Sequence, residues 1–228
     1  MAERINGLVT PDLIIFDCDG VLIDSEILAC AVDAEKLTEQ GFEITTEEVA
    51  RRFAGVPSID VYETVEAQIG RPLPEDFEAM VDREILATYH DHLKPIPGVH
   101  KVLSELTTRR CVASNSRPAK LMLGLVETEL IDYVYPHVFS SVLVEKGKPA
   151  PDLFFYAARQ MGVEPSRCVV IEDSIAGVSG AVAAGMPVIG FPGASHCQDG
   201  HDQRLREVGA RAILPRFEDL HATIAALD

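Results

Sequence analysis

The chain has 228 residues, and its 36 Asp and Glu against 20 Lys and Arg give a formal net charge of −16. This length suits one domain, or one domain with a smaller insert, and the 47% hydrophobic and 25% charged residues exclude intrinsic disorder. The acidic balance argues against a nucleic-acid partner and against an anionic membrane surface, because both attract clustered Lys and Arg.

The first predicted element is a buried strand at residues 13–16, and a long helical stretch follows it. Helical patterns without any strand pattern among them occupy residues 26–40, 46–52, 59–69 and 75–90. Pro95 and Pro97 mark the return to a different rhythm. We therefore predict a helical cap domain at residues 25–94, inserted into a core of residues 1–24 and 95–228. The pattern leaves open whether this insert moves as a lid or packs rigidly on the core.

Beyond the insert, short apolar runs alternate with segments of helical length. The runs, typical of buried parallel strands, are residues 111–113, 138–140, 168–171, 188–191 and 212–214. The helical segments are residues 98–106, 119–129, 152–161 and 175–184. This alternation predicts an α/β fold with a doubly wound, Rossmann-like parallel sheet.

Two pairs of acidic residues stand at predicted strand ends, where open α/β sheets bind ligands. Asp17 and Asp19 follow the first strand, and Glu172 and Asp173 end the run at 168–171. Close carboxylates repel one another unless a cation or proton intervenes, so their convergence predicts a divalent metal, with Mg²⁺ the default for oxygen ligands. Gly20 permits a sharp turn that aims backbone N–H groups at an anion. Polar caps of strands and of the next helix are the alternative.

Polar and basic residues near two other predicted strand ends are suited to an anion. Ser114, Asn115 and Arg117 follow the second strand of the core and can hold phosphate oxygens. Lys146 and Lys148 flank a glycine before a proline-rich turn, where a lysine can stabilise a negative charge. An ordinary polar loop and solvated lysines are the alternatives.

Four segments, in this order, resemble the haloacid dehalogenase superfamily, closest to its β-phosphoglucomutase-like branch of small phosphatases and sugar-phosphate mutases. They are FDCDGVLIDSE (16–26), the strand end at Ser114, GKPAPDLF (147–154) and VVIEDSIAGVSGAVAAGM (169–186). The resemblance runs from residue 13 to about 191. It implies a core with an inserted cap, and it puts the two hinges at residues 24–25 and 94–98.

The resemblance also implies roles for single residues. Asp17 is the nucleophile that becomes an aspartyl phosphate, and Asp19 is first general acid and then general base. Lys148, rather than Lys146, stabilises Asp17 and the transferring phosphoryl group. The implied phosphate contacts are Ser114, the backbone at Asn115, Lys148 and the turn at Gly20. The implied Mg²⁺ ligands are Asp17, the Asp19 carbonyl, Glu172 and Asp173.

Two departures from the mutase pattern favour a phosphatase. Mutases of this branch carry an Arg after a Gly-Val in the cap loop and a His just beyond the hinge, where this chain has Ser58 and Ala29. Water is then the final acceptor, which implies a Mg²⁺-dependent phosphatase for a small phosphorylated metabolite such as a sugar phosphate. A mutase stays the alternative, because Arg52 can supply a cap cation; Arg117 and Ser58 are further candidates for substrate contact.

Readings from other classes fit less well. A dehalogenase does not need Asp19, the second carboxylate after the first strand. A non-enzymatic receiver domain has a phosphorylatable Asp with nearby acids and a Lys, but is about half this length and lacks the insert.

The remaining features bear on compartment and assembly. Five scattered cysteines without a CxxC pair indicate neither a zinc site nor a disulfide framework, and no apolar leader is visible, so we expect a cytoplasmic protein. Residues 174–198 lack Asp, Glu, Lys and Arg, but their glycines and prolines favour a short helix and a buried strand over a membrane span. Residues 193–209, with His196 and His201, are interpreted as a surface loop, with a second lid as the alternative. We expect a monomer, and no motif names its substrate.

Overall fold

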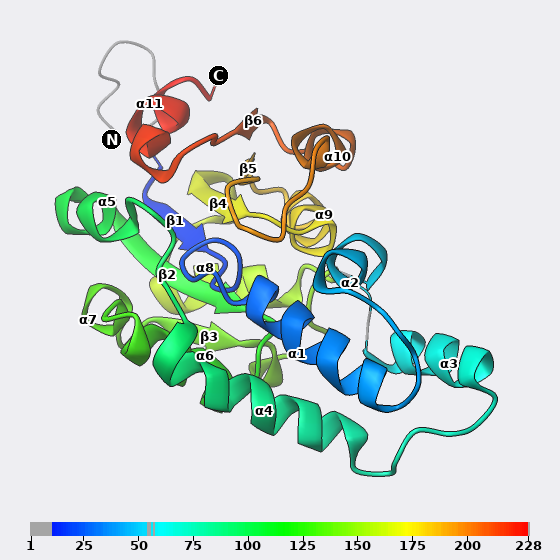
Figure 1. The fold of residues 1–228 in the computed structure, drawn as a ribbon. Coiled ribbons are helices and arrows are strands. Elements are labelled where there is room, and N and C mark those ends of the chain that lie inside the picture. Colours follow the sequence, from blue (N-terminus) through cyan, green and yellow to red (C-terminus); the bar gives the residue numbers. More distant parts are fainter. Residues whose placement is uncertain (1–10, 54–55, 57, 228) are drawn as a thin grey trace.

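The computed structural model describes residues 11–53, 56 and 58–227, and its centre is a six-stranded parallel sheet (Figure 1). The strand order is β3-β2-β1-β4-β5-β6, with β1 between β2 and β4. This is the doubly wound arrangement that the alternating pattern predicts. The strands are β1 (Leu13–Phe16), β2 (Arg109–Ser114), β3 (Val138–Ser140), β4 (Cys168–Glu172), β5 (Val188–Gly190) and β6 (Ala212–Ile213). All six predicted strands are confirmed, with ends that differ by up to two residues.

Helices cover both faces of the sheet because successive residues of each strand point to opposite sides. In β1, Ile14 and Phe16 pack into one buried cluster, and Leu13 and Ile15 pack into the other. The first face carries α5 (Val99–Glu105), α6 (Pro118–Glu127), α7 (Ile131–Val134) and α11 (Leu220–Ala225), and the second carries α8 (Asp152–Met161), α9 (Ile175–Ala183) and α10 (His201–Glu207). Burial on both faces explains why the strands are apolar without alternation.

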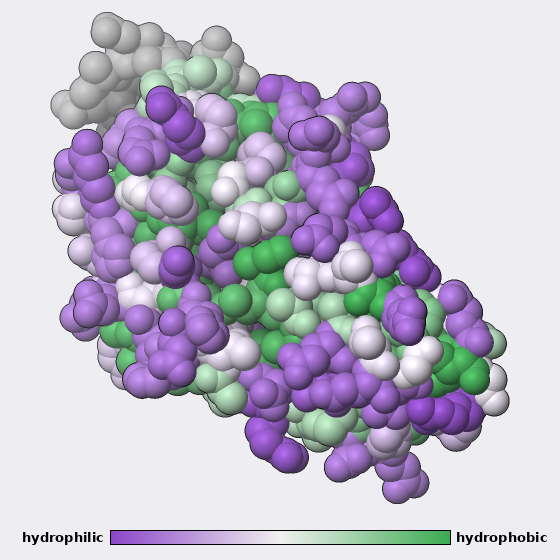
Figure 2. All heavy atoms as spheres, in the orientation of Figure 1, coloured by the Kyte–Doolittle hydropathy of each residue, from purple (hydrophilic) through white to green (hydrophobic). Residues whose placement is uncertain are grey.

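Five helices lie between β1 and β2 in the chain, and the first four of them stand to one side of the sheet (Figure 1). These four are α1 (Glu26–Glu39), α2 (Thr46–Phe53), α3 (Ser58–Ile69) and α4 (Phe77–His92), here called the helical insert. The four helices predicted from the pattern are thereby confirmed. Figure 2 shows hydrophobic residues at the end of the molecule where α3 lies and others at the centre of the same face. Val56, just before α3, and Ile59 in its first turn are exposed.

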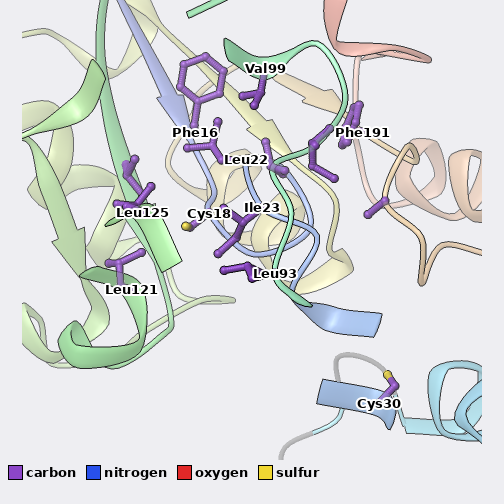
Figure 3. Packing of buried hydrophobic residues seen from close by; sticks show 14 of the residues in the cluster. Phe16, Cys18, Leu22, Ile23, Cys30, Leu93, Val99, Leu121, Leu125 and Phe191 are labelled. Carbon is purple, nitrogen blue, oxygen red and sulfur yellow. The ribbon is translucent and has the colours of Figure 1, made fainter. Parts of the chain in front are cut away.

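The two connections between the insert and the core run side by side. Asp24 donates its backbone N–H to the carbonyl of Lys94 at 2.9 Å, and Ile23 pairs with Pro95 in an antiparallel bridge. Ile23 and Leu93 lie together in Figure 3, and both reach Gly124 of α6. The hydrophobic cluster around Phe16 therefore continues through these connections into the insert.

The interpretation of residues 193–209 as a surface loop is wrong. The segment contains α10, whose Leu205 is fully buried against β5 and β6, and Ala194 and His196 are also buried. This seven-residue helix has four charged residues and one buried apolar residue, Leu205. One apolar residue is too few to show the hydrophobic periodicity of a helix in the sequence.

Two other expectations concern the cysteines and the uncharged stretch. All five cysteines are free, and Cys111 and Cys168 are buried. The uncharged stretch forms α9 and β5, as predicted. Every helix in the described part of the chain is too short or too polar to cross a membrane.

Candidate active site

Asp17 emerges from the end of β1, the central strand of the sheet. Its backbone N–H donates to the carbonyl of Ile171 on β4 at 3.0 Å, which fixes the carboxylate beside the end of that strand. Lys148 Nζ lies 2.7 Å from Asp17 Oδ1 and 2.5 Å from Glu172 Oε1, and all three side chains are buried. The ends of two adjacent strands and the loop before α8 thus bring two carboxylates and one ammonium into direct contact.

Three carboxylates meet at this point, as the sequence predicts if β4 lies beside β1. Oxygens of Asp17, Glu172 and Asp173 lie within 4.8 Å of one another, and all three residues are buried. Burial raises the pKa of Asp17 to about 8, with Glu172 and Asp19 acting in the same direction against Lys148. Burial, Asp17 and Glu172 also raise the pKa of Asp173. Three buried carboxylates against one lysine are the donor set that a hard divalent cation such as Mg²⁺ fits.

The side chain of Asn115, just after β2, holds the backbone of Lys148 in place. Asn115 Nδ2 donates to the Lys148 carbonyl, and its Oδ1 accepts from the Lys148 N–H, both at 2.9 Å. Burial acts to lower the pKa of Lys148, but Asp17 and Glu172 outweigh it, so the ammonium stays charged. Lys146 is exposed. The Asn115 side chain is therefore occupied with this loop, and its predicted phosphate contact rests on the backbone alone.

Asp19 is surrounded by hydrogen-bond donors from three segments. The hydroxyls of Ser25 and Ser116 donate to it at 2.6 Å, and that of Ser114 donates at 3.3 Å. Lys120 Nζ on α6 lies 3.7 Å from its Oδ1. Burial acts to raise the pKa of Asp19, but Lys120 and the three hydroxyls outweigh it and lower the pKa. The carboxylate is therefore held ionised.

Sequence reasoning missed Lys120 and the roles of Ser25 and Ser116. Lys120 lies one turn into a helix, six residues beyond the strand end, and only the packing of α6 brings it to Asp19. Its place at the start of a predicted helix, three residues after Arg117 and two after Pro118, is the signal that the sequence offers.

Gly20 shapes the turn after β1, and its own N–H is used within that turn. The residue has φ = 77°, a left-handed conformation that favours glycine, and a Cβ would fall 1.9 Å from Asp173 Oδ2. Its N–H donates to the carbonyl of Ile23 at 2.8 Å, so it closes the turn instead of facing an anion.

Ser174 begins α9 and also holds Glu172. Its Oγ accepts the N–H of Gly177 at 2.9 Å and donates to Glu172 Oε2 at 3.0 Å, and its backbone N–H reaches the same oxygen at 3.1 Å. The N-cap predicted as an alternative for this end of the strand therefore coexists with the carboxylate cluster.

We expect Gly177→Ala to displace Glu172 and to weaken both fold and activity. A Cβ there would lie 1.8 to 2.2 Å from the Glu172 carboxylate atoms, so that carboxylate must leave Lys148. Overpacking of this kind costs about 1–3 kcal/mol. Denaturant unfolding and turnover measure the two effects. Ser179→Ala in the same helix is the matched control, and equal behaviour of the two variants would contradict this account.

The segment after β5 closes over the other side of Asp173. His196 Nε2 lies 3.4 Å from Asp173 Oδ2, and His201 Nε2 lies 2.5 Å from the Asp173 carbonyl. Ser195 donates its N–H at 3.0 Å and its hydroxyl to the carboxylate of Asp24, which precedes the insert. Spacing along the chain gave no hint of these contacts, because the partners lie 23 to 171 residues away.

The candidate substrate residues lie in the insert or at its edge. Arg117 Nη1 pairs with Asp82 of α4 at 3.0 Å, so it contacts the insert and not the carboxylate cluster. Arg52 stacks on the rings of Phe42 and Phe53. Ser58 lines a cavity between the insert and Lys120. Of the loop that distinguishes mutases, Gly55 and Pro57 lie outside the described residues.

The sheet, the insert after its first strand and the carboxylate–lysine centre define a hydrolase with a Rossmann-like core of the haloacid dehalogenase type. A family model described as haloacid dehalogenase-like hydrolase matches residues 11–185, so the chain belongs to this family. The resemblance seen in the sequence is thereby confirmed.

Two relatives of this chain carry the names of phosphatases, and a solved structure has the same fold. The chain is 31% identical over 195 residues to 6-phosphogluconate phosphatase of Escherichia coli (strain K12), covering 85% of this chain and 86% of that protein. It is 31% identical over 214 residues to a phosphorylated carbohydrates phosphatase of Thermotoga maritima, covering 92% and 97%. A crystal structure of a haloacid dehalogenase-like protein of unknown function from Agrobacterium tumefaciens superposes with a TM-score of 0.88 at 44% identity, covering 94% and 98%. The chain is a phosphoric monoester hydrolase.

Proposed function

We propose that this enzyme is a Mg²⁺-dependent phosphatase that cleaves a small sugar or polyol phosphate through an aspartyl phosphate at Asp17. The observation that carries the proposal is the contact of Asp17 with Lys148, beside Glu172 and Asp173 and two residues from Asp19. Asp17, Glu172 and Asp173 would hold the ion, together with the Asp19 carbonyl. When bound, Mg²⁺ neutralises charge on the phosphoryl group and lets an ionised Asp17 approach it.

In the first half-reaction an oxygen of Asp17 attacks phosphorus and the bond to the leaving oxygen breaks. Lys148 offsets the charge on the transferring group, and the Ser114 hydroxyl donates to a phosphoryl oxygen. Asp19 gives a proton to the leaving oxygen, so that a neutral alcohol departs. In the second half-reaction Asp19 takes a proton from water, which attacks phosphorus and releases phosphate from Asp17.

The hydroxyls around Asp19 give a reason for its change of role. In the structure they hold the carboxylate ionised, the state that a general base needs. If Ser114 turns to a phosphoryl oxygen, Asp19 loses one of its donors while an anion arrives beside it. Both changes raise its pKa, so substrate binding favours the protonated form that the first step requires.

A cavity that Lys120 lines, 3.7 Å from Asp19, supports the substrate class. It has a volume of about 190 Å³ and lies between the insert and α6. Its polar lining includes Glu26, Asp33 and Asp82 against a single cation, Lys120, with the Tyr62 hydroxyl nearby. Three carboxylates repel a second phosphate but accept hydrogen bonds from sugar hydroxyls. A polyhydroxy monophosphate therefore fits better than a bisphosphate, which also disfavours a mutase.

We propose that the insert acts as a cap domain of residues 25–94 over a core of residues 1–24 and 95–228. The paired connections through Asp24 and Lys94 are a short hinge, and the ion pair of Arg117 with Asp82 bridges the two parts. A closed cap excludes water during the first step, and Asp19 then needs one water for the second.

A panel of phosphate esters with Mg²⁺ tests this function. Free phosphate and isomerised sugar phosphate are both measured for neutral sugar phosphates, polyol phosphates, 6-phosphogluconate and a hexose bisphosphate. We expect phosphate release, with kcat/KM for the best neutral ester at least tenfold above that for the bisphosphate. Isomerisation with little phosphate released would overturn the proposal in favour of a mutase.

Removal of the ion should silence the enzyme reversibly. We expect EDTA to abolish turnover and added Mg²⁺ to restore it. Because Asp17 has a pKa of about 8 without metal, it must lose a proton when Mg²⁺ binds. The apparent Mg²⁺ affinity should therefore fall by up to about tenfold per pH unit below pH 8. Isothermal titration calorimetry at pH 6, 7 and 8 measures this slope, and full activity in EDTA contradicts the metal site.

A further inference from the structure

A second group of metal-ligating side chains lies beside the carboxylate cluster, in the segment after β5. His196 and Cys197 extend from this segment toward Asp173 at the end of β4. One ligand atom from each of Asp173, His196 and Cys197 lies within 4.8 Å of the others. The three together offer an oxygen, a nitrogen and a sulfur atom, whereas Asp17 and Glu172 offer oxygen only.

The spacing of the three atoms suits a tetrahedral ion. His196 Nε2 lies 3.4 Å from Asp173 Oδ2 and 3.6 Å from Cys197 Sγ. Zinc bonds are about 2.0–2.2 Å long to nitrogen and oxygen and about 2.3 Å long to sulfur, so tetrahedral ligand atoms stand roughly 3.3–3.6 Å apart. One small ion can therefore reach all three atoms with little rearrangement.

The His196 ring has no other polar partner among the residues that the structure describes. The residue is only 9% exposed, and its Nδ1 makes no hydrogen bond. The polar contacts of Nε2 are with Asp173 and Cys197, the two prospective co-ligands. With the ring proton on Nδ1, the lone pair of Nε2 faces the Asp173 carboxylate and the Cys197 sulfur, so all three groups can bind one ion placed between them.

We propose that Asp173, His196 and Cys197 form a site for a soft divalent cation of the zinc class, and that this ion inhibits the enzyme. Thiolate and imidazole select zinc over magnesium, which keeps oxygen ligands. The Cys197 thiol releases its proton to solvent as the sulfur binds. Asp173 belongs to both sets, so an ion held here takes a ligand from the carboxylate cluster. Binding stands on this geometry alone, while inhibition rests on the proposed Mg²⁺-dependent phosphatase.

Cobalt is the probe for the site, because a thiolate bound to Co²⁺ gives a charge-transfer absorption in the near ultraviolet. The metal-free protein is titrated with Co²⁺ and then with Zn²⁺. We expect this absorption to saturate at one equivalent of Co²⁺ and to disappear as Zn²⁺ displaces it. Cys197→Ser should lose the absorption, and Cys168→Ala, which removes a buried thiol at the far end of β4, should keep it.

Inhibition is measured separately, at constant Mg²⁺ with increasing Zn²⁺. We expect Cys197→Ser to keep its Mg²⁺-dependent turnover and to need at least tenfold more Zn²⁺ for half inhibition. Thermal unfolding verifies that the variant folds, and Cys197→Ala replaces it if it does not. Absorption that persists in Cys197→Ser, or that never appears in the parent protein, overturns the site. Absence of turnover on every ester would refute the proposed function but leave the cobalt result standing.

Discussion

Asp17→Asn should abolish phosphate release while the protein stays folded. The amide keeps the shape of the side chain but cannot attack phosphorus, so we expect turnover to fall at least 1000-fold, equivalent to about 4 kcal/mol of barrier. The fold should survive, because Lys148 keeps Glu172 at 2.5 Å and the variant removes one of three repelling carboxylates. Steady-state phosphate release measures the first effect, and denaturant unfolding measures the second.

The control for this variant is an aspartate at the opposite end of the same strand. Asp12 precedes β1 and pairs with Arg167, far from the carboxylate cluster. Asp12→Asn should keep full turnover and change stability by less than about 1 kcal/mol, as expected for a surface ion pair. Turnover of Asp17→Asn within tenfold of the parent enzyme would contradict the role of Asp17 as nucleophile.

The sequence predicted the site residues that follow strand ends, because the carboxyl ends of parallel strands lie at one edge of the sheet. Asp17 and Glu172 sit on neighbouring strands in register, with Phe16 paired to Ile171. Once the apolar runs were recognised as parallel strands, the meeting of these acids followed from topology. Lys148 needed more than topology, since the resemblance singled it out from Lys146 and the Asn115 side chain holds it in place.

The contacts that the sequence did not reveal come from side chains on helices and loops that cross over the strand ends. Lys120 reaches Asp19 because α6 packs against α4, and His196 reaches Asp173 because the segment that carries it is held by α10, whose Leu205 is buried. Such contacts depend on the angle at which a helix packs, which no local pattern encodes. For the same reason the sequence pointed to Arg117, whose side chain pairs with Asp82, and did not point to Lys120.

Lys148→Met should destabilise the metal-free protein, and Mg²⁺ should restore much of the loss. The methionine leaves Asp17, Glu172 and Asp173 buried without their cation, and removal of one partner from a buried ion pair costs about 3 kcal/mol or more. A bound divalent ion supplies positive charge to the same carboxylates and stabilises the folded state by mass action. Turnover should nevertheless remain at least 100-fold below that of the parent, because in the proposed mechanism Lys148 also stabilises the transferring phosphoryl group. Unfolding with and without Mg²⁺ measures the first effect, and Lys146→Met is the exposed control.

The pH dependence of this variant separates repulsion between carboxylates from a simple loss of packing. In the parent protein the Asp17 carboxyl has a pKa of about 8, above its ordinary value of 3.8, although Lys148 lowers it. Without Lys148 the pKa rises further, so the folded state binds protons more tightly than the unfolded state between pH 4 and 8 and beyond. Stability from this group is therefore present at low pH and lost as the pH rises. Between pH 5 and about 7 the Asp17 carboxyl is protonated in both folded proteins, so the difference in stability between parent and metal-free variant should stay constant. It should widen as the pH rises above about 8, where the parent ionises and the variant does not, whereas a defect of packing alone gives the same difference throughout.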